Sequence, residues 1–279
     1  MTWHVMVTRQ LASYSPLMAA APVGDLLRDW RVRRHLSQLD VAVGAGVSTR
    51  HLSYVETGKS RPSPEMVLSL AAFLDVPLRE RNTLLLAAGH APRFGEAPLD
   101  HPSMSIVRSS ITRMLDAHDP YPAIVANRDW NLELANNAAL RLVGHLPAEL
   151  LEPPINVYRL ALAPNGLAAS SPNLHEWAPT WIGALRRQII MSPTADLESL
   201  HDELCAYPHI ADVLERHEFA DAPDVMIQID LDTPAGRLAL FTTLTTFGTP
   251  TDITLSELVI ELFWPADEAS SALLRQASS

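Results

Sequence analysis

Residues 38–58, QLDVAVGAGVSTRHLSYVETG, decide the fold of the first part of this chain. Ser37, directly before the stretch, and Ser48, within it, are residue types that cap the N-termini of helices. Gly46 lies between them and supplies the permissive backbone of a tight turn. We therefore expect two short helices that cross at this turn. The positions where such helices pack together are apolar: Val41, Ala45, Val47, Leu52 and Val55.

Helical spacing of apolar residues continues on both sides of this stretch. Trp30 belongs to a helix before it, while Pro64 and Pro77 can each open a helix after it. The sequence thus predicts an all-α domain of five helices over residues 22–90. We expect residues 1–21 to form an N-terminal arm, and the proline-containing residues 91–105 to form a linker.

The quoted stretch resembles the helix-turn-helix of the phage-repressor-like Xre family. Glu56 and Gly58 repeat the family's ending, whereas Gly44 departs from it, because the family usually has a helix former there. The resemblance implies binding to a double-stranded DNA operator, with residues 49–57 as the recognition helix. The expected DNA-binding residues are Gln38, Ser48, Thr49, Arg50, Ser53, Tyr54, Lys59 and Arg61.

These DNA-binding residues suit two kinds of contact. A helix in the major groove presents its first residues to base edges, so the Arg50 guanidinium can bind a guanine through two hydrogen bonds. Gln38, Lys59 and Arg61 flank that helix and suit phosphate contacts. Taken singly, each of these residues is equally typical of a solvated surface.

The charge of the chain is divided unevenly along its 279 residues. The formal net charge is −11, which by itself argues against a nucleic-acid partner. Residues 1–95, however, hold 11 Arg and Lys against 7 Asp and Glu, while residues 96–279 hold 10 against 25. The first part is thus basic and the second acidic, which favours two domains with different partners.

Period-two alternation appears only in the second part of the chain. Trp130, Leu132 and Leu134 alternate with Asn131 and Glu133, as in a half-buried strand. Two strands, a helical segment and three further strands indicate an α+β domain over residues 106–279. The expected strands are residues 123–127, 130–135, 225–231, 238–247 and 258–264.

Helices are expected before, between and after these strands. Residues 177–191 place Trp177, Trp181 and Leu185 at intervals of four, with Pro179 acceptable in a first turn. The other expected helices are residues 106–118, a helix after Asn136, residues 196–205, residues 210–219 and a final helix from Ala269.

A second resemblance covers most of the remaining chain. ERNTLLLAAGHAP (residues 80–92), LDAHDPYPAIVANRDWNLELANNAA (residues 115–139), EWAPTWIGALRRQ, VLERHEF and LFWPADEASSALL resemble the actinobacterial-type MmyB-like transcription regulators. The resemblance implies a PAS-like second domain with a five-stranded antiparallel sheet. It also implies a regulator that responds to a small molecule, with a fatty-acid-like ligand known in the fold.

We expect the ligand in an apolar cleft between the sheet and residues 177–191. The candidate ligand-binding residues are Trp130, Arg159, Trp177, Trp181, Leu185, Arg186, Ile189, His217 and Phe241. The three basic side chains are candidates for its polar end. Two alternatives stay open: the apolar residues are ordinary core, or the domain is a dimerisation or protein-interaction module without a ligand.

Other classes of function find little support. The sequence contains no G-x-S-x-G, P-loop, G-x-G-x-x-G or H-E-x-x-H motif, so we expect neither an enzyme nor a cofactor. His201, His209 and His217 are spaced by eight, which turns each away from the last on a helix, and we expect no metal site. The single cysteine, Cys205, forms no internal disulfide.

No stretch is long and apolar enough for a membrane span, and neither end resembles a secretory signal. The sequence thus predicts a cytoplasmic homodimer that binds DNA and a small apolar ligand.

Overall fold

The computed structural model describes residues 21–216 and 227–278. The expected N-terminal arm and His217 lie outside these residues. The contacts divide the chain into two compact units. Unit 1 comprises residues up to Pro98 together with Gly248–Ser256, and unit 2 comprises Leu99–Phe247 and Glu257–Ser279.

Unit 1 contains the five expected helices, so the all-α prediction is confirmed. They are α2 (Val23–Arg33), α3 (Gln38–Gly44), α4 (Thr49–Glu56), α5 (Pro64–Phe73) and α6 (Leu78–Ala87). Their inward faces supply a core of fully buried side chains, which includes Leu27, Leu52, Val55, Leu70 and Leu85.

The turn between α3 and α4 has the expected local chemistry. The Ser37 hydroxyl accepts a hydrogen bond from the Asp40 backbone N–H, and the Asp40 carboxylate accepts one from the Ser37 backbone N–H. Ser48 accepts from the His51 N–H at 3.2 Å. Gly46 has φ +70°, a conformation that glycine adopts without strain. These local interactions fix where α3 ends and α4 begins.

Gly44 shows why this chain departs from the family pattern. A Cβ at Gly44 would lie 1.8 Å from the Phe73 ring. Glycine therefore gives Phe73 of α5 the room to pack against the end of α3.

The segment after α6 is held to that helix. The Asn82 side-chain carbonyl accepts from the backbone N–H groups of Arg93 and Phe94, and its amide donates to the Phe94 carbonyl. Farther along, the Ile253 N–H donates to the Gly95 carbonyl at 2.8 Å, which ties residues 248–256 into unit 1.

Unit 2 is built on one five-stranded antiparallel sheet, as predicted. Its strands are β1 (Ala123–Ala126), β2 (Leu132–Ala135), β3 (Ile229–Thr233), β4 (Gly236–Thr245) and β5 (Val259–Pro265). Their order is β2-β1-β5-β4-β3, so the last strand in sequence is the central strand of the sheet.

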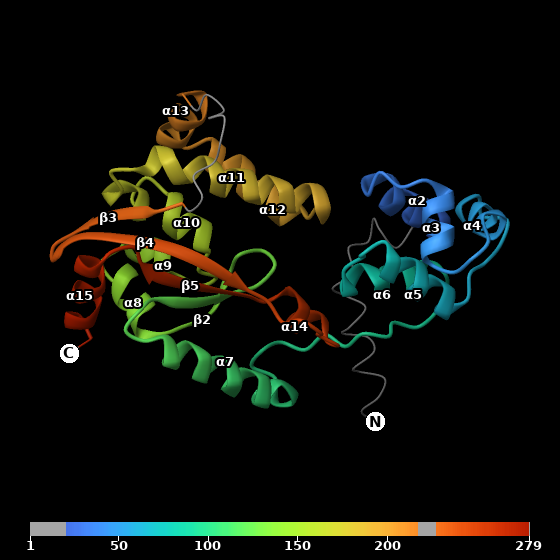
Figure 1. Ribbon diagram of the computed structural model, residues 1–279, viewed down its shortest axis with the longest axis horizontal. Coiled ribbons are helices and arrows are strands. Elements are labelled where there is room, and N and C mark those ends of the chain that lie inside the picture. Colours follow the sequence, from blue (N-terminus) through green and yellow to red (C-terminus); the bar gives the residue numbers. More distant parts are fainter. Residues whose placement is uncertain (1–20, 217–226, 279) are drawn as a thin grey trace. The chain divides into compact units, whose positions relative to one another are not determined.

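Helices lie on both faces of this sheet, with α11 along one face and α7 along the other (Figure 1). The helices of unit 2 are α7 (Ser105–His118), α8 (Asn137–Val143), α9 (Ala148–Leu151), α10 (Val157–Leu162), α11 (Leu174–Met191), α12 (Ala195–Cys205), α13 (Pro208–Arg216) and α15 (Glu268–Gln276), with 3-10 turns at Pro102–Met104 and Leu167–Ser170. Helix α14 (Ile253–Glu257) belongs to unit 1 except for its last residue. The sequence analysis did not predict α9, α10 or α14.

Two local predictions in unit 2 are wrong. Helix α11 begins at Leu174, so Pro179 lies inside it and not in its first turn, and one backbone hydrogen bond is lost there. Trp130 is not part of a strand, because its φ is +61° and β2 begins only at Leu132. A left-handed backbone at a tryptophan is strained, and it requires support from other contacts.

Candidate DNA interface and ligand cavity

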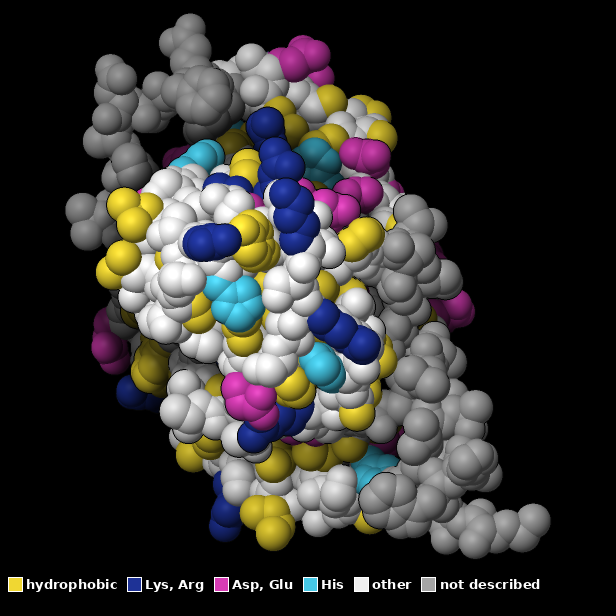
Figure 2. Space-filling view, turned by 90° about the vertical axis from the view of Figure 1, so that its right-hand side faces the viewer, with side chains coloured by type: hydrophobic (Ala, Val, Ile, Leu, Met, Phe, Trp, Pro, Cys, Tyr) yellow, Lys and Arg dark blue, Asp and Glu magenta, His cyan; other side chains and the backbone are white. Residues whose placement is uncertain are grey.

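The exposed side of α4 combines basic and aromatic groups. Arg50 donates through Nε to the Tyr54 hydroxyl at 3.0 Å, and its guanidinium lies 5.3 Å from the centre of the Tyr54 ring. The Lys59 ammonium lies 5.9 Å from the same ring. Lysine and arginine side chains are spread over this face of unit 1 (Figure 2). The arrangement offers hydrogen-bond donors and positive charge to a phosphate backbone and to base edges.

Beneath this surface Gln38 belongs to a charged network. Arg31 donates to both carboxylate oxygens of Glu56, at 2.7 and 2.9 Å, and Gln38 donates to Glu56 Oε2 at 2.8 Å. Burial acts to raise the pKa of Glu56, but the hydrogen bonds from Arg31 and Gln38 outweigh it and keep the pKa below its ordinary value. The network ties α2, α3 and α4 together.

The side chains of the remaining predicted DNA-binding residues differ in their hydrogen bonds and in their burial. Ser48 is engaged as the cap of α4. Arg61 donates to the carbonyls of Ala88 and Gly89, at 2.7 and 3.2 Å, which anchors the end of α6. Thr49 and Ser53 are half-buried on α4.

Unit 2 contains a cavity of about 70 Å³ between the sheet and the helices of the α11 face. Its lining is almost wholly apolar and comes from β1, β2, α8, α10, α11, β3, β4 and β5. The lining residues are Pro122, Ile124, Leu132, Ala135, Ala139, Leu140, Leu142, Val143, Val157, Leu160, Ala161, Leu167, Trp177, Trp181, Ile229, Leu231, Leu240 and Phe263.

Among the predicted apolar ligand residues, Trp177 and Trp181 line this cavity. Leu185 is fully buried in the core and Ile189 packs at its edge, but neither is a lining residue. Phe241 pairs with Trp264 on the opposite face of β4, and its neighbour Leu240 lines the cavity instead.

Trp130 stands beside the cavity in an aromatic cluster. Its ring meets Tyr158 edge to face at 5.0 Å, and Tyr158 meets Trp181 at 5.5 Å. Trp130 thus touches the cavity wall through Tyr158.

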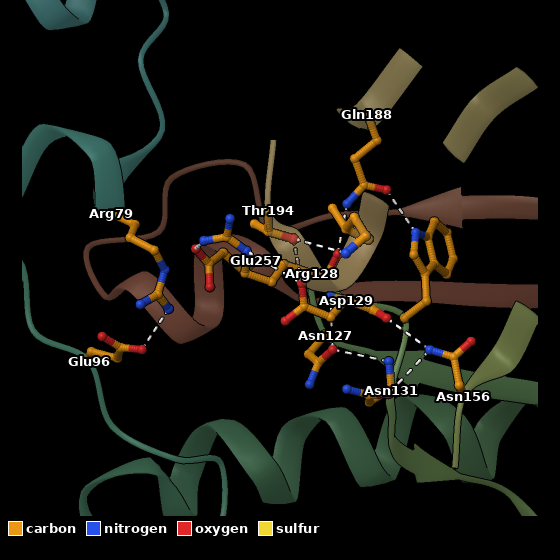
Figure 3. Close-up of polar contacts among 12 residues, drawn as sticks. Arg79, Glu96, Asn127, Arg128, Asp129, Asn131, Asn156, Gln188, Thr194 and Glu257 are labelled. Carbon is orange, nitrogen blue, oxygen red and sulfur yellow. Dashed lines mark hydrogen bonds and ion pairs between the residues drawn. The ribbon is translucent and has the colours of Figure 1, made fainter. Parts of the chain in front are cut away.

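Hydrogen bonds hold Trp130 in its strained conformation (Figure 3). Its indole N–H donates to Gln188 Oε1 at 2.7 Å, and Gln188 Nε2 donates to the Arg128 carbonyl at 2.7 Å. Asn156 donates to the Asp129 carbonyl at 2.9 Å, which joins α10 to the same turn. The β1–β2 turn is thereby fixed to α10 and α11.

Two charged side chains of this turn, Arg128 and Asp129, contact residues outside it. Arg128 Nη1 lies 3.1 Å from Glu257 Oε1. Asp129 contacts Thr194 at 3.5 Å, and burial raises the pKa of its carboxyl group.

The predicted polar ends of the ligand site do not meet at the cavity. Arg159 binds both carboxylate oxygens of Glu203, at 2.7 to 3.0 Å. Arg186 is exposed on α11. His217 lies outside the described residues.

Glu261 is a buried residue that the sequence analysis missed. It lies on β5, its side chain is buried, and its Oε2 atom has no hydrogen-bond partner within residues 21–216 and 227–278. Burial raises the pKa of this carboxyl to about 7, against a hydrogen bond with Thr242 that lowers it. The available signal was a carboxyl between Ile260 and Leu262 in an otherwise apolar strand.

Two of the residues considered for a metal, His201 and His209, lie in the part of the chain that the structure describes. Within the described part of the chain, no group of three or more His, Cys, Asp and Glu side chains is arranged to hold a metal ion. His209 bonds to the Leu162 carbonyl, and His201 lies beside Asp202 and Cys205. No helix in that same part is long and apolar enough to cross a membrane.

Two family models match the chain, one on each part. Residues 27–81 match a helix-turn-helix family, and residues 107–277 match the MmyB-like transcription regulator ligand binding domain. The chain belongs to the MmyB-like transcription regulators. It contains a helix-turn-helix domain and the ligand-binding domain of that family.

Two similar proteins align with different shares of this chain. An uncharacterized HTH-type transcriptional regulator of Bacillus subtilis (strain 168), RghRB, is 39% identical over 77 residues, which are 27% of this chain and 53% of the relative. The chain thus spans about half the length of that relative. An RNA-binding light-oxygen-voltage receptor aligns at 14% identity over 99% of this chain and 67% of its own, with a TM-score of 0.29, too low to indicate a shared fold.

Proposed function

We propose that this regulator binds operator DNA as a homodimer and that a small, mainly apolar ligand in the unit 2 cavity changes its DNA affinity. The cavity enclosed by the sheet, α8 and α11 carries this proposal. It is lined by Trp177 and Trp181 in a domain whose family is a ligand-binding one. The resemblance to the family makes a fatty acid the first ligand to test.

The DNA half of the proposal rests on α4. Arg50 is exposed on the first turn of this helix, where a residue in the major groove reaches base edges. Lys59 follows the helix and suits a phosphate contact. Arg31, Gln38 and Glu56 hold α4 in place, so we propose that Gln38 acts chiefly by positioning this helix.

The size of the cavity limits what it accepts without rearrangement. Its 70 Å³ is less than half of the ~150 Å³ of an engineered apolar cavity that holds benzene. A long acyl chain therefore requires movement of the wall. Leu140 of α8 both lines the cavity and is 49% exposed, so we propose α8 as the side on which the cavity opens.

A ligand changes DNA binding only if it prefers one state of the protein over another. Coupling free energies between two sites are typically about 1 to 3 kcal/mol, which corresponds to about 5- to 150-fold in operator affinity. We expect an effect in this range at saturating ligand.

The test begins with mass spectrometry of an organic extract of the purified protein. A panel of acyl compounds is then screened for a rise in melting temperature and for a change in affinity for DNA selected from random sequences. Trp181→Ala should weaken ligand binding more than DNA binding. Trp264→Ala is the matched control, because it removes a tryptophan that is not part of the cavity lining.

The rival is a dimerisation or protein-interaction module without a ligand. An empty extract, together with a panel that changes neither the melting temperature nor operator affinity, would reject the ligand proposal in favour of this rival.

A further inference from the structure

Helix α14 belongs to both units of the chain. The connection between β4 and β5, two strands that line the cavity, crosses into unit 1 and returns to unit 2 at Glu257, the last residue of α14. Within unit 1, the Ile253 N–H donates to the Gly95 carbonyl at 2.8 Å, and the Ile253 side chain is fully buried. The next residue, Glu96, forms an ion pair with Arg79 of α6 at 2.6 Å. The first part of α14 is therefore held to unit 1.

The last residue of α14 is held by unit 2. Glu257 Oε1 lies 3.1 Å from Nη1 of Arg128, which belongs to the β1–β2 turn (Figure 3). The two side chains are only 15% and 18% exposed, and water and salt screen a partly buried ion pair much less than an exposed one. A displacement of Arg128 therefore changes the interactions of Glu257, and with them the end of α14.

The β1–β2 turn, residues 127–131, is also joined to the wall of the cavity. It connects β1 and β2, and both strands contribute lining residues, as does α11. Gln188 of α11 donates to the Arg128 carbonyl and accepts from the Trp130 indole N–H, both at 2.7 Å. A ligand larger than the cavity of about 70 Å³ displaces this wall, so it acts on the turn through both strands and through α11.

We propose that the β1–β2 turn and the Arg128–Glu257 pair form a relay that transmits ligand binding in the cavity to unit 1 through α14. The proposal rests on the proposed function, because it states how the ligand of that cavity changes DNA binding. The backbone of Trp130 supplies the second state that a relay needs. Its φ of +61° is strained and persists only while other contacts hold it, so loss of the Gln188 contacts lets the turn relax. A ligand that moves α11 thus favours the relaxed turn, and the ion pair passes the change to α14.

The first measurement needs no ligand. Coupling between two sites is reciprocal, so DNA bound to unit 1 must in turn alter the β1–β2 turn. Amide hydrogen exchange is followed in the full chain, free and bound to DNA selected from random sequences. The readout is the Trp130 amide, which donates to the Asn127 carbonyl at 3.0 Å. We expect DNA to change its exchange rate by about fivefold or more, the lower end of common coupling factors, and that of the β3–β4 turn, residues 233–236, by less than about twofold.

The second measurement uses the fatty acid decanoate as the probe. Tryptophan fluorescence measures its binding, and fluorescence anisotropy measures its effect on the affinity for the selected DNA. The comparison is repeated on Glu257→Ala, which breaks the relay pair, and on the matched control Glu203→Ala, which breaks the Arg159–Glu203 pair elsewhere in unit 2. Far-UV circular dichroism checks that each variant is folded.

We expect decanoate to change DNA affinity by about 5- to 150-fold in the wild-type chain and in Glu203→Ala, and by less than about twofold in Glu257→Ala. All three chains should still bind decanoate, because neither glutamate lines the cavity.

An unchanged exchange rate at Trp130 in the DNA-bound chain would overturn the relay. An equal effect of decanoate on the DNA affinity of Glu257→Ala and of the wild-type chain would also overturn it, and would leave the ligand proposal standing. A wild-type chain that binds no decanoate would count against a fatty acid as the ligand, while the exchange measurement would still decide the relay. The same measurement decides it if Glu257→Ala fails to fold.

Discussion

The two units each bury a glutamate, and the surroundings of these glutamates differ. Glu56 of unit 1 is 6% exposed, and Glu261 of unit 2 is 4% exposed. Arg31 and Gln38 satisfy Glu56, and its pKa is lowered. Glu261 has an oxygen without a partner among residues 21–216 and 227–278, and burial raises its pKa to about 7. Two glutamates of similar exposure thus have pKa values shifted in opposite directions. The hydrogen bonds from Arg31 and Gln38 account for the lowered pKa of Glu56.

This difference fits the functions that we propose for the two units. A recognition helix must hold one position to place its side chains against DNA, and the Glu56 network is complete without a ligand. Unit 2 is the proposed ligand-binding unit, and its Glu261 Oε2 atom has no hydrogen-bond partner within the described residues. The predictions below test this contrast, from the largest expected effect to the smallest.

Arg31→Ala should destabilise unit 1 strongly. Removing one partner of a buried ion pair leaves an uncompensated charge, at a cost of about 3 to 5 kcal/mol in the free energy of unfolding. Urea unfolding measures the loss. Arg28→Ala is the control, because Arg28 is an exposed cation on the same helix without a hydrogen bond to Glu56. Similar losses in both variants would show that the ion pair contributes little beyond general charge.

Glu261→Gln should stabilise unit 2 as the pH rises. The folded pKa of about 7 lies above the ordinary value of 4.5, so burial disfavours the ionised form in the folded state. The penalty is absent at pH values below 4.5, grows between 4.5 and 7, and is constant above 7. The stability gap between Glu261→Gln and wild type should thus shift in favour of the variant by about 2 to 3 kcal/mol from pH 5 to pH 8.

Denaturant unfolding at four or five pH values measures this gap. Asp232→Asn should show no such growth, since its carboxyl is exposed. A gap that stays constant from pH 5 to pH 8 would mean that Glu261 is satisfied in the folded protein.

Arg50→Ala should weaken operator binding by about 1 to 3 kcal/mol, the usual worth of a bidentate base contact, and leave binding to random DNA nearly unchanged. Lys59→Ala should weaken both to the same degree, as expected for a phosphate contact. Gel-shift titrations on the two DNAs measure the difference. An equal loss on both DNAs for Arg50→Ala would assign Arg50 to the phosphate backbone.

The sequence predicted those features of the structure that depend on residues close together in the chain. Ser37 and Ser48 each bond to the backbone three residues ahead, and Gly46 forms the turn between the two helices. These residues therefore predicted the boundaries of α3 and α4. Helix α10 was missed because five of its six residues are buried, which leaves no polar face and hence no helical period. The strained backbone of Trp130 depends on Gln188, which is 58 positions away in the chain.

The same distinction explains the ligand site. Helical spacing identified Trp177 and Trp181, but it also included Leu185, because a period shows which face is buried and not where packing leaves a space. Whether Glu261 Oε2 finds a hydrogen-bond partner depends on which side chains the neighbouring strands and helices bring near it, and within the described residues it has none. No local pattern of residues reveals that a partner is missing.

Arg159→Ala should have the smallest effect, and it tests whether Arg159 forms the polar end of the ligand site. Arg159 and Glu203 form an ion pair whose side chains are 40% and 35% exposed, so we expect a loss of at most about 1 kcal/mol in the free energy of unfolding. Because neither residue lines the cavity, the affinity for an acyl compound that binds the wild-type chain should stay within about twofold, well below the loss that follows removal of a charged hydrogen-bond partner. Arg186→Ala, which removes an exposed cation from α11, is the control and should change neither quantity. A tenfold or greater loss of binding of that acyl compound in Arg159→Ala, with none in Arg186→Ala, would place the polar end of the site at Arg159.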